Sequence, residues 1–408
     1  MPEAASTAAS NTAATRTQYE GGSVTLSTGA GRVTIRVSES FDELRDSWLA
    51  LQRHAVCSYS QSYYWAEGWH RIVAAPEGAR AVLIHGRDAQ GECRFILPFE
   101  LGKSSGQRVI RFIGQDHANY NTGLFQPAFA SALNRRDIDE ILCAAVDMIG
   151  GADAALFCHQ PRDIGGYLNP FAHMPHTDSA NSGYALKLQS DFKSVYEARV
   201  SKNRRSNLTR SERRLASEGP VTVCDAASAA ESAALLDVCF AQKRERFAER
   251  GIEDSFAEQR YRDFYKEMAA LERREDGKLN VSCLKVGEEI AATRCRVALG
   301  GRHNDVISSI TSGPLQALSP GQVLLRHQIE QACAAGYIFE DFGAGAAPHK
   351  DIWCDSRIAL FDSHLALSPK GHALCAYEGL KTRLKHMVKT TPALWETYQD
   401  LRKRLRGK

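Results

Sequence analysis

The sequence predicts a mixed α/β fold, an α+β type of mixed sheet, built from two consecutive units. Three observations lead to this prediction. A chain of 408 residues is long enough for two domains that each bury a core. Short β-branched runs alternate with longer segments of helical periodicity. The order strand, two helices, three strands, helix, strand occurs within residues 33–157 and again within residues 221–342, which favours a tandem duplication.

The composition is typical of a soluble globular protein. Hydrophobic residues make up 43% and charged residues 24%, and the net charge of +3 gives no field that would mark a nucleic-acid-binding protein. Eleven scattered cysteines without a C-x-x-C pair favour reduced thiols over a disulfide framework. No apolar run approaches the roughly 20 residues of a membrane span, and the N-terminus lacks the features of a secretion signal. We therefore expect a cytoplasmic protein.

Residues 1–31 are mostly Ala, Ser, Thr and Gly, and such a segment buries too little surface to offset the entropy of ordering. We expect a disordered tail there and a first domain over residues 32–180. Its helices are expected after the capping residues Ser40 and Ser62 and over 138–149. Its expected strands are 33–37, 81–85, 95–101, 109–113 and 154–157.

The first unit has no glycine-rich phosphate turn, so we do not expect it to bind a coenzyme. It has an aromatic cluster that could stack on a sugar ring, although such clusters more often form a core or a domain interface. The cluster consists of Tyr59, Tyr63, Tyr64, Trp65 and Trp69.

Residues 181–370 are expected to form the second domain, after a boundary loop at 158–183. No metal site is predicted at His173 and His176, because Pro175 opposes a helical H-x-x-H and no third ligand is evident. A helix follows whose basic face could bind phosphates or RNA, or could simply be solvated. Its basic residues are Arg199, Lys202, Arg204, Arg205, Arg210, Arg213 and Arg214. The next expected elements are strands 221–224, 279–286, 290–299 and 306–311 and helices 228–248 and 257–272.

The stretch 306–343 organises the second unit. Ser319-Pro320-Gly321 ends a strand and begins a helix, because Ser caps, Pro suits the first turn and Gly lets the backbone approach a ligand. Apolar residues from Val323 to Cys333 line one helical face, Gly336 is a terminator, and a short strand follows at 338–342. The start of this helix directs unpaired N–H groups and a partial positive charge at one point, which makes it a candidate anion site.

The segment from Gln316 to Gly321 has the spacing Q-x-x-G-x-G, with Ser319 in place of the first Gly. This pattern resembles the pyrophosphate-binding loop of the GNAT superfamily of N-acetyltransferases. Downstream, Asp341-Phe342-Gly343, then Gly345 and His349-Lys350-x-x-Trp353, resemble the BioF-like or cellulose-biosynthesis type of GNAT protein, which is related to the Fem aminoacyl transferases. The resemblance implies tandem GNAT-like domains, of which the first is degenerate.

The resemblance also implies acetyl-CoA or another acyl-CoA as a co-substrate. Its pyrophosphate would be held by Gln316, Ser319, Pro320, Gly321, Gln322 and Val323. The two strands that flank the helix should diverge and leave a slot for the pantetheine arm, as in GNAT proteins. Backbone N–H groups there would polarise the thioester carbonyl.

Asp341 is the expected general base. Strand alternation places Glu340 and Asp341 on opposite faces, and the resembling motif has its acid at the position of Asp341. Partial burial would raise the pKa of Asp341 toward a useful range, while the alternative is a structural acid that caps the turn at 343–345. The resemblance gives Lys350 the role of stabilising negative charge on the donor or the intermediate, and Trp353 is expected to be a core anchor.

The polar loop 114–123 is the expected acceptor site, because the resembling families carry a D-Y or H-x-D-Y signature there that faces the inter-domain cleft. The candidates are Asp116, His117, Asn119 and Tyr120.

Taken together, the sequence predicts an N-acyltransferase that acts on an amine, in its family context an amino sugar of a surface polysaccharide or of a lipid-linked precursor. The alternatives are a Fem-like enzyme that uses aminoacyl-tRNA and a non-catalytic scaffold of a polysaccharide synthase. A nucleic-acid partner is not expected, and no oligomeric state is predicted. Residues 371–408 are expected to form basic helices, which are either solvated or in peripheral contact with the inner membrane.

Overall fold

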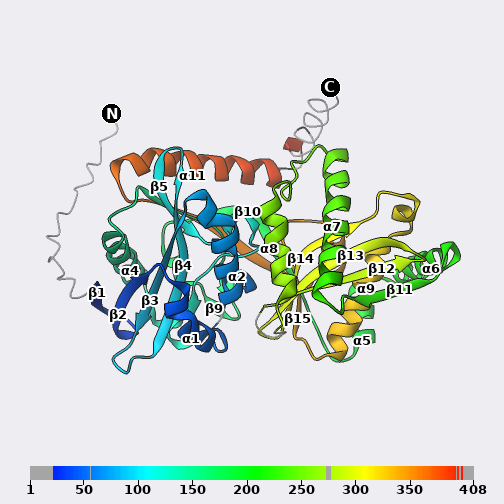
Figure 1. Cartoon of the computed structure of the whole chain (residues 1–408), viewed down its shortest axis with the longest axis horizontal. Coiled ribbons are helices and arrows are strands. Elements are labelled where there is room, and N and C mark those ends of the chain that lie inside the picture. Colours follow the sequence, from blue (N-terminus) through cyan, green and yellow to red (C-terminus); the bar gives the residue numbers. More distant parts are fainter. Residues whose placement is uncertain (1–21, 56, 273–276, 392, 395–396, 398–408) are drawn as a thin grey trace, which may run out of the picture.

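The computed structural model describes residues 22–391 except 56 and 273–276, together with 393–394 and 397 (Figure 1). The strands of the first half are β1 (Ser23–Thr28), β2 (Gly31–Ser38), β3 (Arg80–Arg87), β4 (Cys93–Ser104), β5 (Gln107–Phe112), β6 (Leu124–Phe125) and β7 (Ala154–Pro161). Its main helices are α1 (Phe41–Gln52), α2 (Tyr63–Trp69) and α4 (Arg135–Met148).

The second half begins after a small hairpin of β8 (Asp163–Ile164) and β9 (Tyr167–Leu168). Its strands are β10 (Thr177–Lys187), β11 (Val221–Asp225), β12 (Leu279–Val286), β13 (Glu289–Leu299), β14 (Arg302–Ile310), β15 (Phe339–Ala344) and β16 (Ser356–Ala366). Its helices are α5 (Phe192–Arg199), α6 (Lys202–Glu218), α7 (Ala229–Glu249), α8 (Gln259–Ala270), α9 (Pro320–Ala334), α10 (Pro348–Trp353) and α11 (Pro369–Thr390).

Both halves repeat one pairing pattern. In the first half β2, β3, β4, β5 and β7 are neighbours in that order, with three antiparallel pairs and then a parallel pair. In the second half β11 to β15 pair in the same way. Two helices follow the first strand of each set. The parallel pair is connected by the short α3 (Pro127–Ala132) and α4 in the first half, and by α9 in the second. The predicted fold class, a mixed α/β sheet in two consecutive units, is confirmed.

Two strands join the halves into one sheet. Strand β16 pairs with β7 of the first half and with β10, and β10 pairs in turn with β15. Within the described residues, the sheet therefore comprises 14 strands and runs through the whole molecule (Figure 1). The sequence does not predict either strand, and the expected domain boundary at 180/181 lies inside β10.

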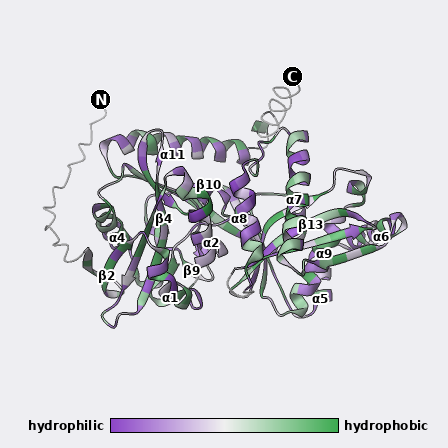
Figure 2. Ribbon diagram, in the orientation of Figure 1, coloured by the Kyte–Doolittle hydropathy of each residue, from purple (hydrophilic) through white to green (hydrophobic). Residues whose placement is uncertain are grey.

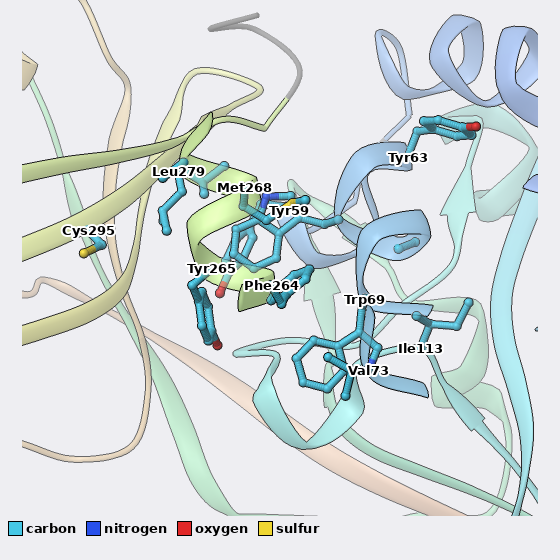
Figure 3. Packing of buried hydrophobic residues seen from close by; sticks show 14 of the residues in the cluster. Tyr59, Tyr63, Trp69, Val73, Ile113, Phe264, Tyr265, Met268, Leu279 and Cys295 are labelled. Atoms are coloured by element: carbon cyan, nitrogen blue, oxygen red, sulfur yellow. The ribbon is translucent and has the colours of Figure 1, made fainter. Parts of the chain in front are cut away.

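The aromatic cluster of the first half is core and interface, as the commoner interpretation expects. Tyr59, Tyr63, Trp65 and Trp69 are buried. The ring of Trp65 packs edge-on against Phe264 of α8 at 5.2 Å, and its indole N–H donates to the carbonyl of Gly277 at 2.6 Å. Figure 3 shows Tyr59 and Trp69 packed beside Phe264 and Tyr265. The two halves thus share an apolar core as well as a sheet.

Some local predictions are wrong. Residues 23–31, expected in a disordered tail, form β1, a turn and the first residue of β2, because β1 pairs with β2 and Val24 is buried in the core of the first half. The rest of that tail, residues 1–21, lies outside the described residues. Ser62 occupies the N-cap of α2 without capping it, since its hydroxyl donates to the carbonyl of Tyr59. Ser40 caps α1 as predicted.

Candidate active site

Helix α9 begins at the predicted residues but not in the predicted way. Ser319 is in the left-handed region, with φ 56° and ψ 47°, and its side chain caps no N–H group. The expected hydroxyl cap is therefore wrong. Pro320 takes the first helical position as predicted. A Cβ on Gly321 would lie 2.8 Å from Cγ2 of Ile310, so glycine allows α9 to pack closely against β14.

A cavity of about 450 Å³ lies against the start of α9. Of the six predicted coenzyme contacts, four line it, namely Gln316, Ser319, Gly321 and Gln322. Pro320 and Val323 are buried, and Val323 packs in an apolar core with Leu315 and Leu324. The cavity thus contains the surface of the predicted loop and the uncapped beginning of the helix.

A second wall of this cavity is cationic. Lys243, Arg246 and Arg250 line it from the C-terminal end of α7, where their spacing places them on one face. Burial and the charge of the neighbouring Arg250 lower the pKa of Arg246. Sequence analysis missed them, although the K-x-x-R-x-x-x-R spacing at the end of a helix is visible in the sequence.

Strands β14 and β15 diverge beside the cavity as predicted. They pair only over Arg302–Asn304 and Phe339–Asp341 in the described structure. The carboxamide of Asn119 fills the gap, since its Nδ2 donates to the carbonyl of Asp305 at 2.8 Å and its Oδ1 accepts from the N–H of Ala344 at 3.2 Å. Asn119, a predicted acceptor contact, thus connects the two strands through hydrogen bonds to the backbone of both.

Asp341 lies where the pairing of β14 and β15 ends, opposite Asn304. Its Oδ1 accepts hydrogen bonds from the hydroxyl of Tyr120 and the N–H of Gly343, both at 2.8 Å. Burial raises the pKa of Asp341, against the opposing effect of these two donors. Together with Arg302 and Asn304 it lines a small cavity of about 60 Å³.

Glu340 points to the opposite face, as strand alternation predicts. Its carboxylate is fully buried and lies 2.9 Å from Nη1 of Arg294. His303 and Arg296 complete the surroundings of this carboxylate. Because Glu340 is buried beside two arginines, which lower its pKa, it is poorly placed to act as a base.

Lys350 is buried and, like Asp341, forms hydrogen bonds with the backbone of the turn at 343–344. Its Nζ donates to the carbonyls of Gly343 and Ala344, both at 3.1 Å, and burial lowers its pKa. Neither Lys350 nor Asp341 lines the 450 Å³ cavity, but the neighbouring His349 and Asp305 do. Burial lowers the pKa of His349 to about 4, so its imidazole is neutral at pH 7.

The other two predicted acceptor contacts lie apart from these residues. Asp116 is exposed, with Oδ2 at 3.8 Å from Nη1 of Arg111. His117 stacks on Tyr261 of α8 at 4.4 Å and belongs to the aromatic interface. The structure therefore brings Asn119 and Tyr120 to the β14–β15 junction and does not bring Asp116 and His117 there. Trp353 is a buried core residue, as predicted.

Comparison with known proteins gives a family match for part of the chain and a similar fold for most of it. Residues 202–351 match the family model of the acetyltransferase (GNAT) domain. The solved structure of FemX is similar, with a TM-score of 0.55 and 12% identity over 82% of this chain and 98% of that one. L-PGS from Bacillus licheniformis has a TM-score of 0.50 and 13% identity over 85% of this chain and 98% of that one. Comparison with curated protein sequences finds no significant match.

At these identities the solved structures show the fold alone. The tandem GNAT-like fold predicted from the sequence is confirmed, and the matched domain occupies its second half. The match to an acetyltransferase (GNAT) domain is confined to residues 202–351.

Proposed function

We propose that the protein transfers an acyl group, acetyl in the simplest case, from acyl-CoA to an amine. The observation that carries this proposal is the cavity in which the open start of α9 meets Lys243, Arg246 and Arg250. A helix N-terminus together with a cluster of cations is suited to a ligand that carries several phosphates. Acyl-CoA has this chemistry, and proteins with GNAT domains commonly use it.

The protein would act by positioning the acyl donor and the amine and by accepting a proton. The N–H of Gly321 and the three cations would hold the phosphates, because Pro320 has no N–H group and that of Gln322 donates to the carbonyl of Ser319 at 3.0 Å. The thioester would then lie toward Asp305 of β14, beside the gap that Asn119 fills. Holding the amine against the thioester can supply roughly 7–11 kcal/mol of the barrier. A base must then accept the proton that the amine loses as the C–N bond forms, and the thiolate leaves.

Asp341 is the proposed base, on the strength of the resembling motif and its raised pKa. Its contacts with Gly343 and Tyr120 equally fit the alternative role of a structural acid. If Asp341 is only a structural acid, Asp305 and His349 are the candidate bases, because both line the 450 Å³ cavity. For the acceptor we propose an amino sugar of a surface polysaccharide or of its lipid-linked precursor, as the resemblance implies.

A second candidate is aminoacyl transfer from tRNA. Two observations favour it: the likeness to FemX and the basic face of α6. Arg199 and Arg205 serve the fold, since they donate to the carbonyls of Trp353 and Val200. The exposed cations of α6 that remain are Lys202, Arg204, Arg210, Arg213 and Arg214.

A thermal-shift titration tests the proposal. With acetyl-CoA at about 100 times its Kd, the native state should gain about 2.7 kcal/mol. Longer acyl-CoAs and free CoA are titrated in the same way for comparison. If no acyl-CoA shifts the transition, the proposal fails, and a gel shift with aminoacyl-tRNA then separates the second candidate from a scaffold without activity.

A further inference from the structure

A larger cavity lies between α11 and the sheet of the first half. It measures about 830 Å³ and shares no lining residue with the coenzyme cavity. Figure 1 shows α11 running along one side of the molecule, where it packs on β10 and β16. From the sheet the cavity is lined by Arg111, Cys158, His159, Asp362 and His364, among others. Nothing in the proposed acyl transfer uses this space.

The helix side of this cavity is cationic. Lys381, Lys385 and Lys389 line it at intervals of four residues along α11. Lys381 pairs with Glu378, and Lys389 donates to Oδ1 of Asn181. Among the described residues, Lys385 has no acidic partner. Burial and the charge of Lys385 lower the pKa of Lys389, so an anion between the two ammonium groups would stabilise both charges.

Three acids line the same cavity, namely Asp116, Asp362 and Glu378, and their other contacts are known. Asp362 accepts from the N–H of His159 at 2.8 Å and from the hydroxyl of Thr382. Oδ2 of Asp116 lies 3.8 Å from Nη1 of Arg111, and Glu378 forms an ion pair with Lys381. Within the described residues, neither Lys385 nor Lys389 forms an ion pair with any of these three acids.

The outer face of the same helix is apolar. Large side chains at intervals of three and four residues are exposed there, and a helical face of this kind normally packs against something. They are Tyr377, Leu380, Leu384 and Met387, with exposed fractions of 61, 57, 48 and 49%. Figure 2 shows hydrophobic and hydrophilic residues alternating along α11. Leu384 also lines the cavity, so the apolar stripe and the lysine wall adjoin.

We propose that α11 lies on a bilayer surface that contains anionic phospholipid. The stripe of Tyr377, Leu380, Leu384 and Met387 enters the interface, and the cavity wall at Lys385 and Lys389 holds the phosphate of a lipid headgroup. The charge of the helix fits such a surface, because α11 carries five Lys and Arg residues against the single acid Glu378. No helix in the described part of the chain is long and apolar enough to cross a membrane, so contact would be peripheral.

Vesicle sedimentation with the full chain tests this inference. The wild type should bind vesicles of phosphatidylcholine with phosphatidylglycerol, and binding should weaken with added salt and without phosphatidylglycerol. The variant Leu380→Ser/Leu384→Ser should bind about tenfold more weakly. Ile338→Ser is the matched control, because Ile338 is 52% exposed on the other half of the molecule and should not change binding. Lys385→Ala/Lys389→Ala should weaken binding only to the anionic vesicles.

Circular dichroism and thermal unfolding of each variant show that it is folded. The inference is overturned if the wild type does not bind the anionic vesicles, or if the double serine variant binds as the wild type does. It is also overturned if the wild type forms a dimer that the serine variant abolishes while neither binds vesicles, since the stripe would then contact a second copy. If the lysine variant binds undiminished, the cavity has no part in holding a headgroup.

Discussion

The hydroxyl of Tyr120 donates a 2.8 Å hydrogen bond to Oδ1 of Asp341, and both side chains are buried. The two residues are 221 positions apart, one in the polar loop of the first half and one in β15 of the second. A predicted acceptor contact and a predicted base are thus each other's partners. The bond ties the two halves together at the point where β14 and β15 diverge.

Replacing Tyr120 with Phe should destabilise the protein. The substitution keeps the ring and removes one hydrogen bond to an ionisable group, a loss of about 1.5–3 kcal/mol in the free energy of unfolding. Since this bond lowers the pKa of Asp341, its loss should also raise that pKa further. Urea unfolding measures the first effect. Tyr64→Phe is the control, because the hydroxyl of Tyr64 accepts only a long 3.5 Å hydrogen bond from exposed Arg45 in the described structure. Equal stability of both variants would contradict the prediction.

Asp341→Asn separates the two roles proposed for this carboxylate. If Asp341 is the base, turnover should fall about 10²–10⁴-fold, while the thermal shift with acetyl-CoA stays unchanged. The amide oxygen can still accept the N–H of Gly343, so the turn should persist. Asp305→Asn is the companion variant, because Asp305 lines the 450 Å³ cavity at the start of α9. Turnover that survives the first change and not the second would place the base in that cavity.

Much of the repeated fold could be predicted because its signals are local. The helix at Pro320–Ala334 has its Pro at the first position, its apolar face and its terminator Gly336, with φ 80°, all within one stretch of sequence. β14 begins at Arg302, earlier than predicted, because Gly300 and Gly301, both with positive φ, form the hairpin turn from β13. That Gly-Gly signal was present in the sequence.

The remainder depends on partners that sequence alone does not show. β10 reads TDSANSGYALK, too polar for a strand until β15 and β16 flank it. Asn119 was predicted from its loop to contact an acceptor, but its partners are backbone groups of Asp305 and Ala344, more than 180 residues away. The cations of α7 meet α9 only in the folded molecule. Propensity and spacing locate elements, whereas the walls of a cavity come from tertiary structure.

Arg246→Gln should weaken acyl-CoA binding. One lost charge-assisted contact with a phosphate corresponds to about 1.4 kcal/mol, or about a tenfold rise in Kd. Calorimetric titration measures it directly. Arg244→Gln is the matched control on the same helix, since Arg244 lies toward Asp254 at 3.7 Å and does not line the cavity. Two variants with the same Kd would show that α7 does not contact the coenzyme.

The buried carboxyl of Glu100 should make the stability of the protein depend on pH. Burial raises its pKa to about 7 from the usual 4.5, although Arg111 donates to it at 2.7 Å. A carboxyl with a raised folded pKa contributes its stability below the unfolded pKa and loses it as pH rises through the folded one. Between about pH 4 and pH 8, the wild type should therefore lose roughly 3 kcal/mol relative to Glu100→Gln. Glu39→Gln is the control, because Arg80 lowers the pKa of exposed Glu39 and the slope should have the opposite sign.

Gly343 and Asn119 should be energetically coupled. A Cβ on Gly343 would lie 2.5 Å from the carboxamide of Asn119, and Gly343 has φ 71°, so Gly343→Ala adds both a clash and backbone strain. In an Asn119→Ala background the clash is gone and only the strain remains, about 1 kcal/mol. A double-mutant cycle by urea unfolding should thus give a coupling of about 1–3 kcal/mol, with Gly343→Ala far less costly in that background. Gly287→Ala is the control, since Gly287 also has positive φ, 58°, with nothing near its Cβ, and its cost should not depend on Asn119. Additive effects of the Gly343 and Asn119 changes would mean that Asn119 does not fill the gap between β14 and β15 in solution.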